Sequence, residues 1–216
     1  MTHSEENYLR AIYHLGRDGD GYVSTNAIAD RLATKPSSVT DMVKKLAEKG
    51  LLDYVRYQGV SLTESGENVA LTLIRKHRLW EVFLVEKLHF SWDEVHEVAE
   101  QLEHIKSEKL IDKLDALLQY PKYDPHGDPI PDKDGKFERR EKKLLSEMNV
   151  GEAGICVGVK DSSATFLKFL DRHQIALGNN IKIMEREEYD GSLTLLIEGR
   201  EISISHQIAS NLYLNS

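Results

Sequence analysis

Residues 96–104 place four metal-capable side chains within nine positions of the chain. If this segment is one α-helix, His96, Glu100, Glu103 and His104 lie along a single face. Imidazole and carboxylate are the groups that hold Mn²⁺, Fe²⁺ or Zn²⁺ in proteins. A solvated polar face would have the same pattern, so the rest of the chain must decide between the two interpretations.

The composition limits both the ligands and the compartment. The 216 residues, 40% of them hydrophobic, are enough for one large domain or two to three small ones. A single cysteine, Cys156, excludes an internal disulfide and a thiolate zinc site. The sequence has no apolar stretch of membrane-spanning length and no signal-peptide pattern at its amino terminus, so we expect a cytoplasmic protein that does not enter the membrane.

The net charge of −8 is unusual for a protein that binds nucleic acid, but the charge is unevenly spread. Residues 1–62 hold eight Lys and Arg against eight Asp and Glu, whereas residues 63–150 hold 14 against 19. The middle segment also holds five of the nine histidines. The first segment is therefore neutral, and the groups that can bind a metal are concentrated in the second.

The amino-terminal segment has the pattern of a winged helix-turn-helix. Ser24 is suited to cap a second helix, and Pro36 is suited to the first turn of a third. Alternating residues after Gly50 predict a β-hairpin, the wing. Some winged helices only pack proteins together, but DNA binding is the commoner use. The expected helices are 4–16, 25–32 and 36–49, and the expected strands are 51–57 and 60–62.

The third helix would read DNA. Small hydroxyl side chains at its start can donate to phosphates and let the helix enter a major groove. Lysines on the same helix can neutralise flanking phosphates. The residues expected to contact DNA are Thr25, Lys35, Pro36, Ser37, Ser38, Thr40, Lys44, Lys45 and, on the wing, Arg56.

The remaining sequence predicts a mainly α protein with a small β part. Amphipathic helices, also candidates for a dimer interface, are expected from 63 to about 84, from 91 to about 107 and from 109 to 118. Prolines between 121 and 131 mark an irregular connection. Four short β segments follow, which indicates a small β-barrel; they are 155–159, 181–185, 193–198 and 201–205.

His77 and Glu81 lie one turn apart on the long helix. His77 alone would be an ordinary solvated residue. Paired across helices with the carboxylates and imidazole of 100–104, it would complete a nitrogen and oxygen shell that suits a divalent ion. Asn7 can add an amide oxygen, which would tie the first helix to the metal.

These motifs resemble the diphtheria-toxin-repressor and manganese-transport-regulator family of metal-dependent transcriptional repressors. The resemblance rests on residues 6–13, 36–40, 75–79 and 100–104, and it covers about the first 135 residues. The carboxy-terminal part resembles the family's SH3-like accessory domain. The resemblance implies a homodimer that binds palindromic double-stranded operator DNA when loaded with Mn²⁺ or Fe²⁺ and represses metal-uptake genes. It implies domains over 1–72, 73–140 and 150–216, which are the winged helix, the metal-binding and dimerisation helices, and an SH3-like β-barrel.

The family's metal ligands can be carried over to this chain. Asn7 stands where relatives have Asp or Met, and Arg10 stands where some have a second-metal Glu. Glu100 replaces a Cys of iron-type members, which favours Mn²⁺. The primary site would be Asn7, His77, Glu100, Glu103 and His104, and a second site would use Glu81, Asp124, His126 and Asp161, with His96 as a competing ligand. Asp124 and Asp161 fit equally well as ordinary loop acids.

Two other functions fit parts of the sequence. Clusters of His and Glu on helices also build dimetal carboxylate enzymes, but paired Glu-x-x-His motifs are lacking and the winged helix would have no role. A winged-helix regulator with an organic effector would bind DNA equally well in a chelator. We therefore expect a repressor that is not an enzyme, with Mn²⁺ as the preferred metal.

Overall fold

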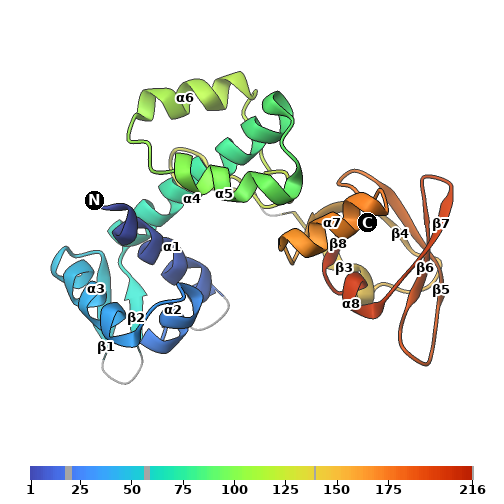
Figure 1. Cartoon of the computed structure of the whole chain (residues 1–216), viewed down its shortest axis with the longest axis horizontal. Coiled ribbons are helices and arrows are strands. Elements are labelled where there is room, and N and C mark those ends of the chain that lie inside the picture. The colour runs from blue at the N-terminus through green and yellow to red at the C-terminus, as the bar shows by residue number, and fades with distance from the viewer. Residues whose placement is uncertain (18–20, 56–58, 139, 216) are drawn as a thin grey trace. The chain divides into compact units, whose positions relative to one another are not determined.

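The computed structural model describes residues 1–17, 21–55, 59–138 and 140–215 (Figure 1). The chain forms two compact units, and helices α4 (Glu64–Leu88) and α5 (Trp92–Leu102) contribute residues to both. The first unit comprises Met1–His77, Leu102–Lys106 and Pro131–Lys136, and the second comprises Arg78–Gln101, Ser107–Ile130 and Phe137–Ser216.

The amino-terminal part of the first unit is a helix-turn-helix, as the sequence predicts. Ser24 caps the second helix by accepting a hydrogen bond from the backbone N–H of Ala27, and Pro36 begins the third. Apolar side chains at helical spacing, such as Leu9, Ile28 and Leu46, are completely buried between the helices. The three helices are α1 (His3–Arg17), α2 (Thr25–Arg31) and α3 (Pro36–Glu48).

The wing follows α3 as a two-stranded antiparallel hairpin. Strand β1 (Leu52–Val55) pairs with β2 (Gly59–Leu62) from Leu52 opposite Leu62. An isolated bridge from Val23 to Val60 joins the hairpin to the segment before α2. The expected DNA contact Arg56 lies outside the described residues.

Glu5 ties the start of α1 to the end of α3. Its carboxylate is 1% exposed, and its Oε1 lies 2.7 Å from Lys49 Nζ and 3.0 Å from Lys45 Nζ. Hydrogen bonds from Lys49, from the backbone of Thr2 and from Lys45 lower the pKa of Glu5 to about 2. Helices α1 and α3 are therefore held together by charge as well as by apolar packing.

The low pKa of Glu5 makes the stability of this part depend on pH. Since its folded-state pKa lies below the ordinary 4.5, the ionised carboxylate stabilises the fold above pH 4.5, and this stability is lost as the pH falls towards about 2. We expect Glu5→Gln to lower the free energy of unfolding near neutral pH by about 1–2 kcal/mol, because both lysines are half exposed. The loss of stability in acid should also become shallower. Denaturant unfolding at several pH values, with the exposed Glu48→Gln as control, measures both effects. If the free energy of unfolding depended on pH equally in wild type and Glu5→Gln, this assignment would be contradicted.

Helix α5 ends earlier than the sequence predicts. It was expected to continue to about Ser107, but it stops at Leu102, and Ser107 already caps the next helix. The side chains of Glu103 and His104 are buried in the turn between the two helices, with partners of their own. These contacts outweigh continuation of the helix, so the prediction of four ligands on one helical face is wrong. The helices of this part are α4 (Glu64–Leu88), α5 (Trp92–Leu102) and α6 (Glu108–Leu117).

The carboxy-terminal part of the second unit is a six-stranded antiparallel sheet with helices beside it (Figure 1). This agrees with the predicted SH3-like domain. The strand order is β3-β8-β4-β5-β6-β7, and no pairing joins the edge strands β3 and β7 within the described residues, so the expected barrel is not closed. Phe166, Leu167 and Leu170 from α7 pack into the core of the sheet. The elements are β3 (Lys143–Leu144), the short 3-10 helix η1 (Leu145–Glu147), β4 (Ala153–Val159), α7 (Ala164–Arg172), β5 (Asn180–Arg186), β6 (Leu193–Ile197), β7 (Arg200–Ile204), α8 (His206–Ala209) and β8 (Leu212–Asn215).

A tight turn from Asp124 to Asp128 packs against strand β4 within the second unit. The backbone N–H of Val159 donates to His126 O at 3.0 Å. Gly127 has φ +84°, and a Cβ added to it would lie 1.9 Å from Val157 O. Only glycine fits here, because a side chain would meet both a left-handed backbone and a neighbouring carbonyl.

Over the described ranges, no helix is long and apolar enough to cross a membrane.

Candidate functional site

The first group of metal-capable side chains surrounds Glu103, whose side chain is 0% exposed. Its Oε2 accepts hydrogen bonds from Arg10 Nη1 at 2.7 Å and from His77 Nδ1 at 2.6 Å. Among the described residues its Oε1 has no hydrogen-bond partner, and His104 Nε2 lies 3.7 Å away. We call Glu6, Arg10, His77, Glu103 and His104 the Glu103 cluster; all belong to the first unit.

His104 is oriented by a carboxylate on α1. Its Nδ1 lies 2.5 Å from Glu6 Oε2, and the ring of His3 stacks on it with centroids 4.1 Å apart. With Nδ1 engaged by Glu6, the Nε2 atom remains on the side of Glu103. Histidine ligands in metal sites are commonly held this way, with one ring nitrogen donating to a carboxylate and the other facing the ion. Glu6 was not predicted from the sequence, where its position next to Asn7 is the one signal that points to it.

Asn7 contributes a second buried oxygen without a partner. Its Oδ1 is buried and makes no hydrogen bond within the described structure. On α1, Asn7 lies between Glu6, which contacts His104, and Arg10, which contacts Glu103. Glu6 and Arg10 are about one helical turn apart. An orphaned amide oxygen, an orphaned carboxylate oxygen and two imidazoles fit the nitrogen and oxygen shell of Mn²⁺ or Fe²⁺. Glu100, the fifth predicted primary ligand, lies on α5 in the second unit, 3.6 Å from His96 Nε2.

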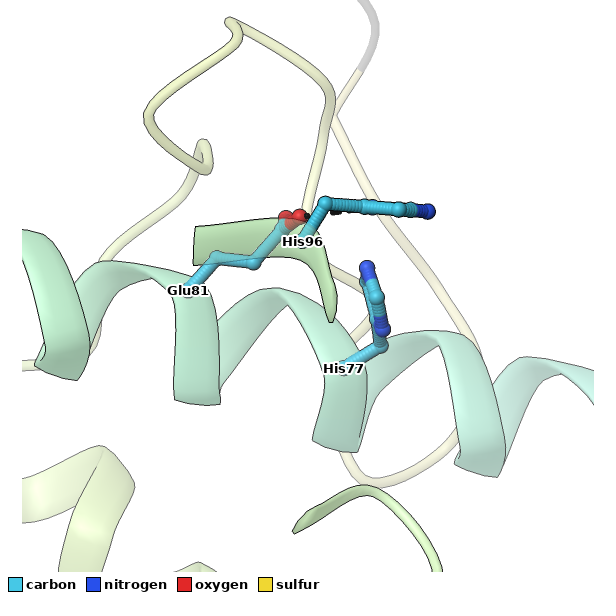
Figure 2. Close-up of side chains that lie close together, drawn as sticks. All are labelled: His77, Glu81 and His96. Atoms are coloured by element: carbon cyan, nitrogen blue, oxygen red, sulfur yellow. Dashed lines mark hydrogen bonds and ion pairs between the residues drawn. The ribbon is translucent and has the colours of Figure 1, made fainter. Parts of the chain in front are cut away.

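The second group surrounds Glu81, which is 2% exposed on α4. Its Oε1 lies 3.2 Å from His96 Nδ1 and 3.6 Å from His126 Nε2. Figure 2 shows His77 and Glu81 on successive turns of α4, with the Glu81 carboxylate beside His96. The structure therefore brings together three of the predicted secondary ligands, which are Glu81, His96 and His126.

Asp124 and His126 add buried charge to this group. Burial raises the pKa of Asp124 to about 7, and Glu81 adds to the rise despite Arg78 Nε at 3.3 Å from Asp124 Oδ2. Burial lowers the pKa of His126, but Glu81 and Asp124 outweigh it, and the net shift is upward. Neither ring nitrogen of His126 has a hydrogen-bond partner in the described part of the chain. Two buried carboxylates beside an imidazole that makes no hydrogen bond with a described residue favour a cation here.

We call Arg78, Glu81, His96, Asp124 and His126 the Glu81 cluster. Asp161, the remaining predicted secondary ligand, is not brought into this cluster by any hydrogen bond or ion pair in the described structure. Its Oδ1 accepts a hydrogen bond at 2.8 Å from the backbone of Ser163, in the loop before α7. The local hydrogen bond of Asp161 is typical of an ordinary loop acid, the other interpretation that the sequence allows.

The predicted DNA contacts lie mostly at the exposed start of α3. Lys35 precedes the helix with an extended backbone and makes no capping hydrogen bond through its side chain, so the first backbone N–H groups of α3 are not capped by this residue. Thr25 is partly buried. Lys45 contacts Glu5, which the sequence did not predict. The residues exposed at the surface are Lys35, Pro36, Ser37, Ser38, Thr40, Lys44 and Lys45.

Three family models match successive parts of the chain. Residues 1–60 match the iron-dependent repressor N-terminal DNA-binding domain, and residues 63–132 match the iron-dependent repressor metal-binding and dimerisation domain. Residues 143–215 match the FeoA domain. The iron-dependent repressor family, to which the first two models belong, is one of transcriptional repressors rather than enzymes.

Curated relatives support the same assignment. The iron-dependent repressor IdeR of Mycobacterium tuberculosis is 36% identical over 131 residues, which are 61% of this chain but only 56% of that protein. The regulator MntR of Oceanobacillus iheyensis is 38% identical over 123 residues, which cover 57% of this chain and 82% of the relative. The chain thus matches little more than half the length of the mycobacterial repressors.

The fold agrees over nearly the whole chain with a solved structure described as a manganese-dependent transcriptional repressor in complex with manganese. The two are 33% identical, the TM-score is 0.85, and the match covers 98% of this chain and 99% of the other. The resemblance seen in the sequence motifs is confirmed. The chain therefore belongs to the diphtheria-toxin-repressor and manganese-transport-regulator family of iron- and manganese-dependent transcriptional repressors.

Proposed function

We propose that this protein is a transcriptional repressor that binds operator DNA more tightly when a divalent metal, Mn²⁺ by preference or Fe²⁺, is bound. The observation that carries the proposal is the buried Oε1 of Glu103, which accepts no hydrogen bond from any described residue and faces His104 Nε2 in the same unit as the helix-turn-helix. Relatives described as iron-dependent and manganese-dependent repressors support the choice of metals.

Most of the proposed ligands belong to the Glu103 cluster or to the Glu81 cluster. Bound metal would supply concentrated positive charge and preferred ligand directions at buried carboxylates. Glu6 holds the His104 ring so that Nε2 faces Glu103, and Asn7 directly follows Glu6 on α1. The proposed primary ligands are Asn7, His77, Glu100, Glu103 and His104, and the proposed secondary ligands are Glu81, His96, Asp124, His126 and Asp161.

Helix α1 can transmit the state of the Glu103 cluster to the recognition helix. Glu6 contacts His104, and the adjacent Glu5 contacts Lys45 and Lys49 of the α3 region. A change in the position of α1 therefore alters both contacts. If metal and DNA favour the same position of α1, each increases the affinity for the other, typically about 5–150-fold for a linked pair of sites.

We further propose that the chain acts as a homodimer joined through its middle helices. Residues 1–72 would then bind DNA, and residues 73–140 would join the protomers. Residues 150–216 would form the accessory domain. Two recognition helices would meet the halves of a palindrome roughly 34 Å, or a multiple of that distance, apart. The genes expected under this control are those for metal uptake.

A titration of operator affinity against metal tests the function. DNA fragments are selected from genomic DNA with the Mn²⁺-loaded protein, and binding is followed by fluorescence anisotropy in Mn²⁺, in Fe²⁺ without oxygen and in chelator. We expect at least about tenfold tighter binding with either metal than in chelator. A fragment with scrambled half-sites is the control. Equal affinity under all three conditions would exclude metal-dependent repression and would favour a regulator with an organic effector.

A further inference from the structure

Arg10 brings a permanent positive charge into the Glu103 cluster. Its Nη1 lies 2.7 Å from Glu103 Oε2 and 3.4 Å from His77 Nδ1, and its side chain is only 16% exposed. A guanidinium does not lose its proton in a protein, so this charge is present whatever else is bound. Arg10 thus contacts two of the proposed metal ligands, although an arginine cannot itself ligate a cation.

We propose that Arg10 is a tethered cation that stabilises the metal-free protein and thereby weakens metal binding at the Glu103 cluster. This inference rests on the proposed function. A carboxylate that is 0% exposed costs free energy unless a positive charge and hydrogen bonds compensate it. Arg10 provides both at Oε2 before any metal arrives, so the metal-free state is not left with an uncompensated buried charge.

The two carboxylate oxygens of Glu103 have different contacts. Oε2 accepts hydrogen bonds from Arg10 and His77, whereas Oε1 accepts none in the described part of the chain and faces His104 Nε2 at 3.7 Å. A divalent ion bound by Glu103 would have to share one negative charge with the guanidinium. Repulsion between a single and a double positive charge at such short range corresponds to about tenfold or more in affinity, even at the dielectric of water. Arg10 therefore raises the metal concentration at which the sensor responds.

A purely structural role for Arg10 predicts the opposite sign. If the guanidinium only holds Glu103 in a useful orientation, its removal loosens the ligand, and both stability and metal affinity fall. If Arg10 is a tethered cation, its removal lowers the stability of the metal-free protein but raises its affinity for metal. The two measurements then move in opposite directions.

The test compares the full-length chain with Arg10→Met, which keeps an unbranched apolar stem without the charge. All proteins carry Glu81→Gln, so that ions at the Glu81 cluster do not contribute. Mn²⁺ affinity is measured by competition with a fluorescent chelator, and thermal unfolding is followed without metal. We expect about tenfold tighter Mn²⁺ binding and a lower Tm for Arg10→Met. Arg17→Met is the control, because Arg17 lies on the same helix with its guanidinium 5.6 Å from the Tyr13 ring.

The outcomes separate this inference from the proposed function. If Mn²⁺ binding by the parent protein is unchanged by His104→Ala, the metal site itself is wrong. If the parent binds Mn²⁺ through His104 but Arg10→Met binds it equally or more weakly, the tethered-cation role is overturned. Should Arg10→Met not fold without metal, Arg10→Gln gives the same comparison, since its amide can still donate to Glu103 without a charge.

Discussion

Replacing Glu103 with glutamine is expected to abolish the metal response of operator binding. Glu103 is the buried carboxylate shared by Arg10, His77 and His104, and its Oε1 accepts no hydrogen bond within the described residues. An amide lacks the negative charge that holds a divalent ion, so Mn²⁺ affinity should fall by about 100-fold or more. The metal-free protein should also lose about 1–3 kcal/mol of stability, because Arg10 loses its counter-charge.

Glu97→Gln is the matched control for this experiment. Glu97 lies on α5, six residues earlier, and its side chain is exposed. The control should keep wild-type Mn²⁺ affinity in chelator competition and wild-type metal dependence in fluorescence anisotropy. If Glu103→Gln also kept both while remaining folded, the Glu103 cluster would not be the metal-sensing site. A comparison of Tm in chelator separates loss of metal binding from loss of folding.

Gly127→Ala is expected to detach the turn from Asp124 to Asp128 from strand β4. The added Cβ would lie 1.9 Å from Val157 O and 2.6 Å from Gly158 Cα, so the backbone must move. The positive φ of +84° adds strain for any side chain. We expect a local destabilisation of about 3 kcal/mol or more. Hydrogen exchange measures it directly, because the amide of Val159 donates to His126 O and should lose its protection.

Gly151→Ala is the control for backbone strain. Gly151 also has a positive φ, +90°, but a Cβ added there meets nothing within 4 Å. Gly151→Ala should therefore show only the modest loss of stability of an alanine in the left-handed region, and the Val159 amide should keep its protection from hydrogen exchange. Equal protection of Val159 in wild type and Gly127→Ala would mean that this turn is not held by its contact with β4. Because Asp124 and His126 lie in the same turn, metal binding by the Glu81 cluster should weaken together with the protection of Val159.

The parts of the fold that the sequence predicts well have strong local signals. Ser24 and Pro36 mark the starts of α2 and α3 because a cap and a fixed φ act within one turn of the chain. The end of α5 was not predictable in this way. Residues 103–107 contain no glycine or proline, and the helix stops at Leu102 while Glu103 and His104 are buried against residues distant in sequence. The barrel was likewise expected from short alternating segments, which do not reveal whether edge strands meet.

The same distinction applies to the candidate sites. Residue types identified His77, Glu81, Glu103 and His104 as groups that could hold a metal. They did not reveal that Arg10 shares an oxygen with His77, since the two are 67 positions apart. The contact of Arg78 with Asp124 was also invisible, because it requires the fold of the 124–128 turn. Side chains that orient or neutralise a ligand have no fixed spacing from it, and they emerge only in three dimensions.

The ion pairs of Glu5 bear on how the protein searches a chromosome. Lys45 and Lys49 stand at the end of the recognition helix, yet an internal carboxylate already compensates part of their charge. Attraction to arbitrary DNA grows with the number of phosphates that lysines and arginines neutralise. The helix-turn-helix should therefore hold random sequences more weakly than its count of lysines suggests. A regulator that leaves wrong sequences quickly spends a larger share of its time at the right one.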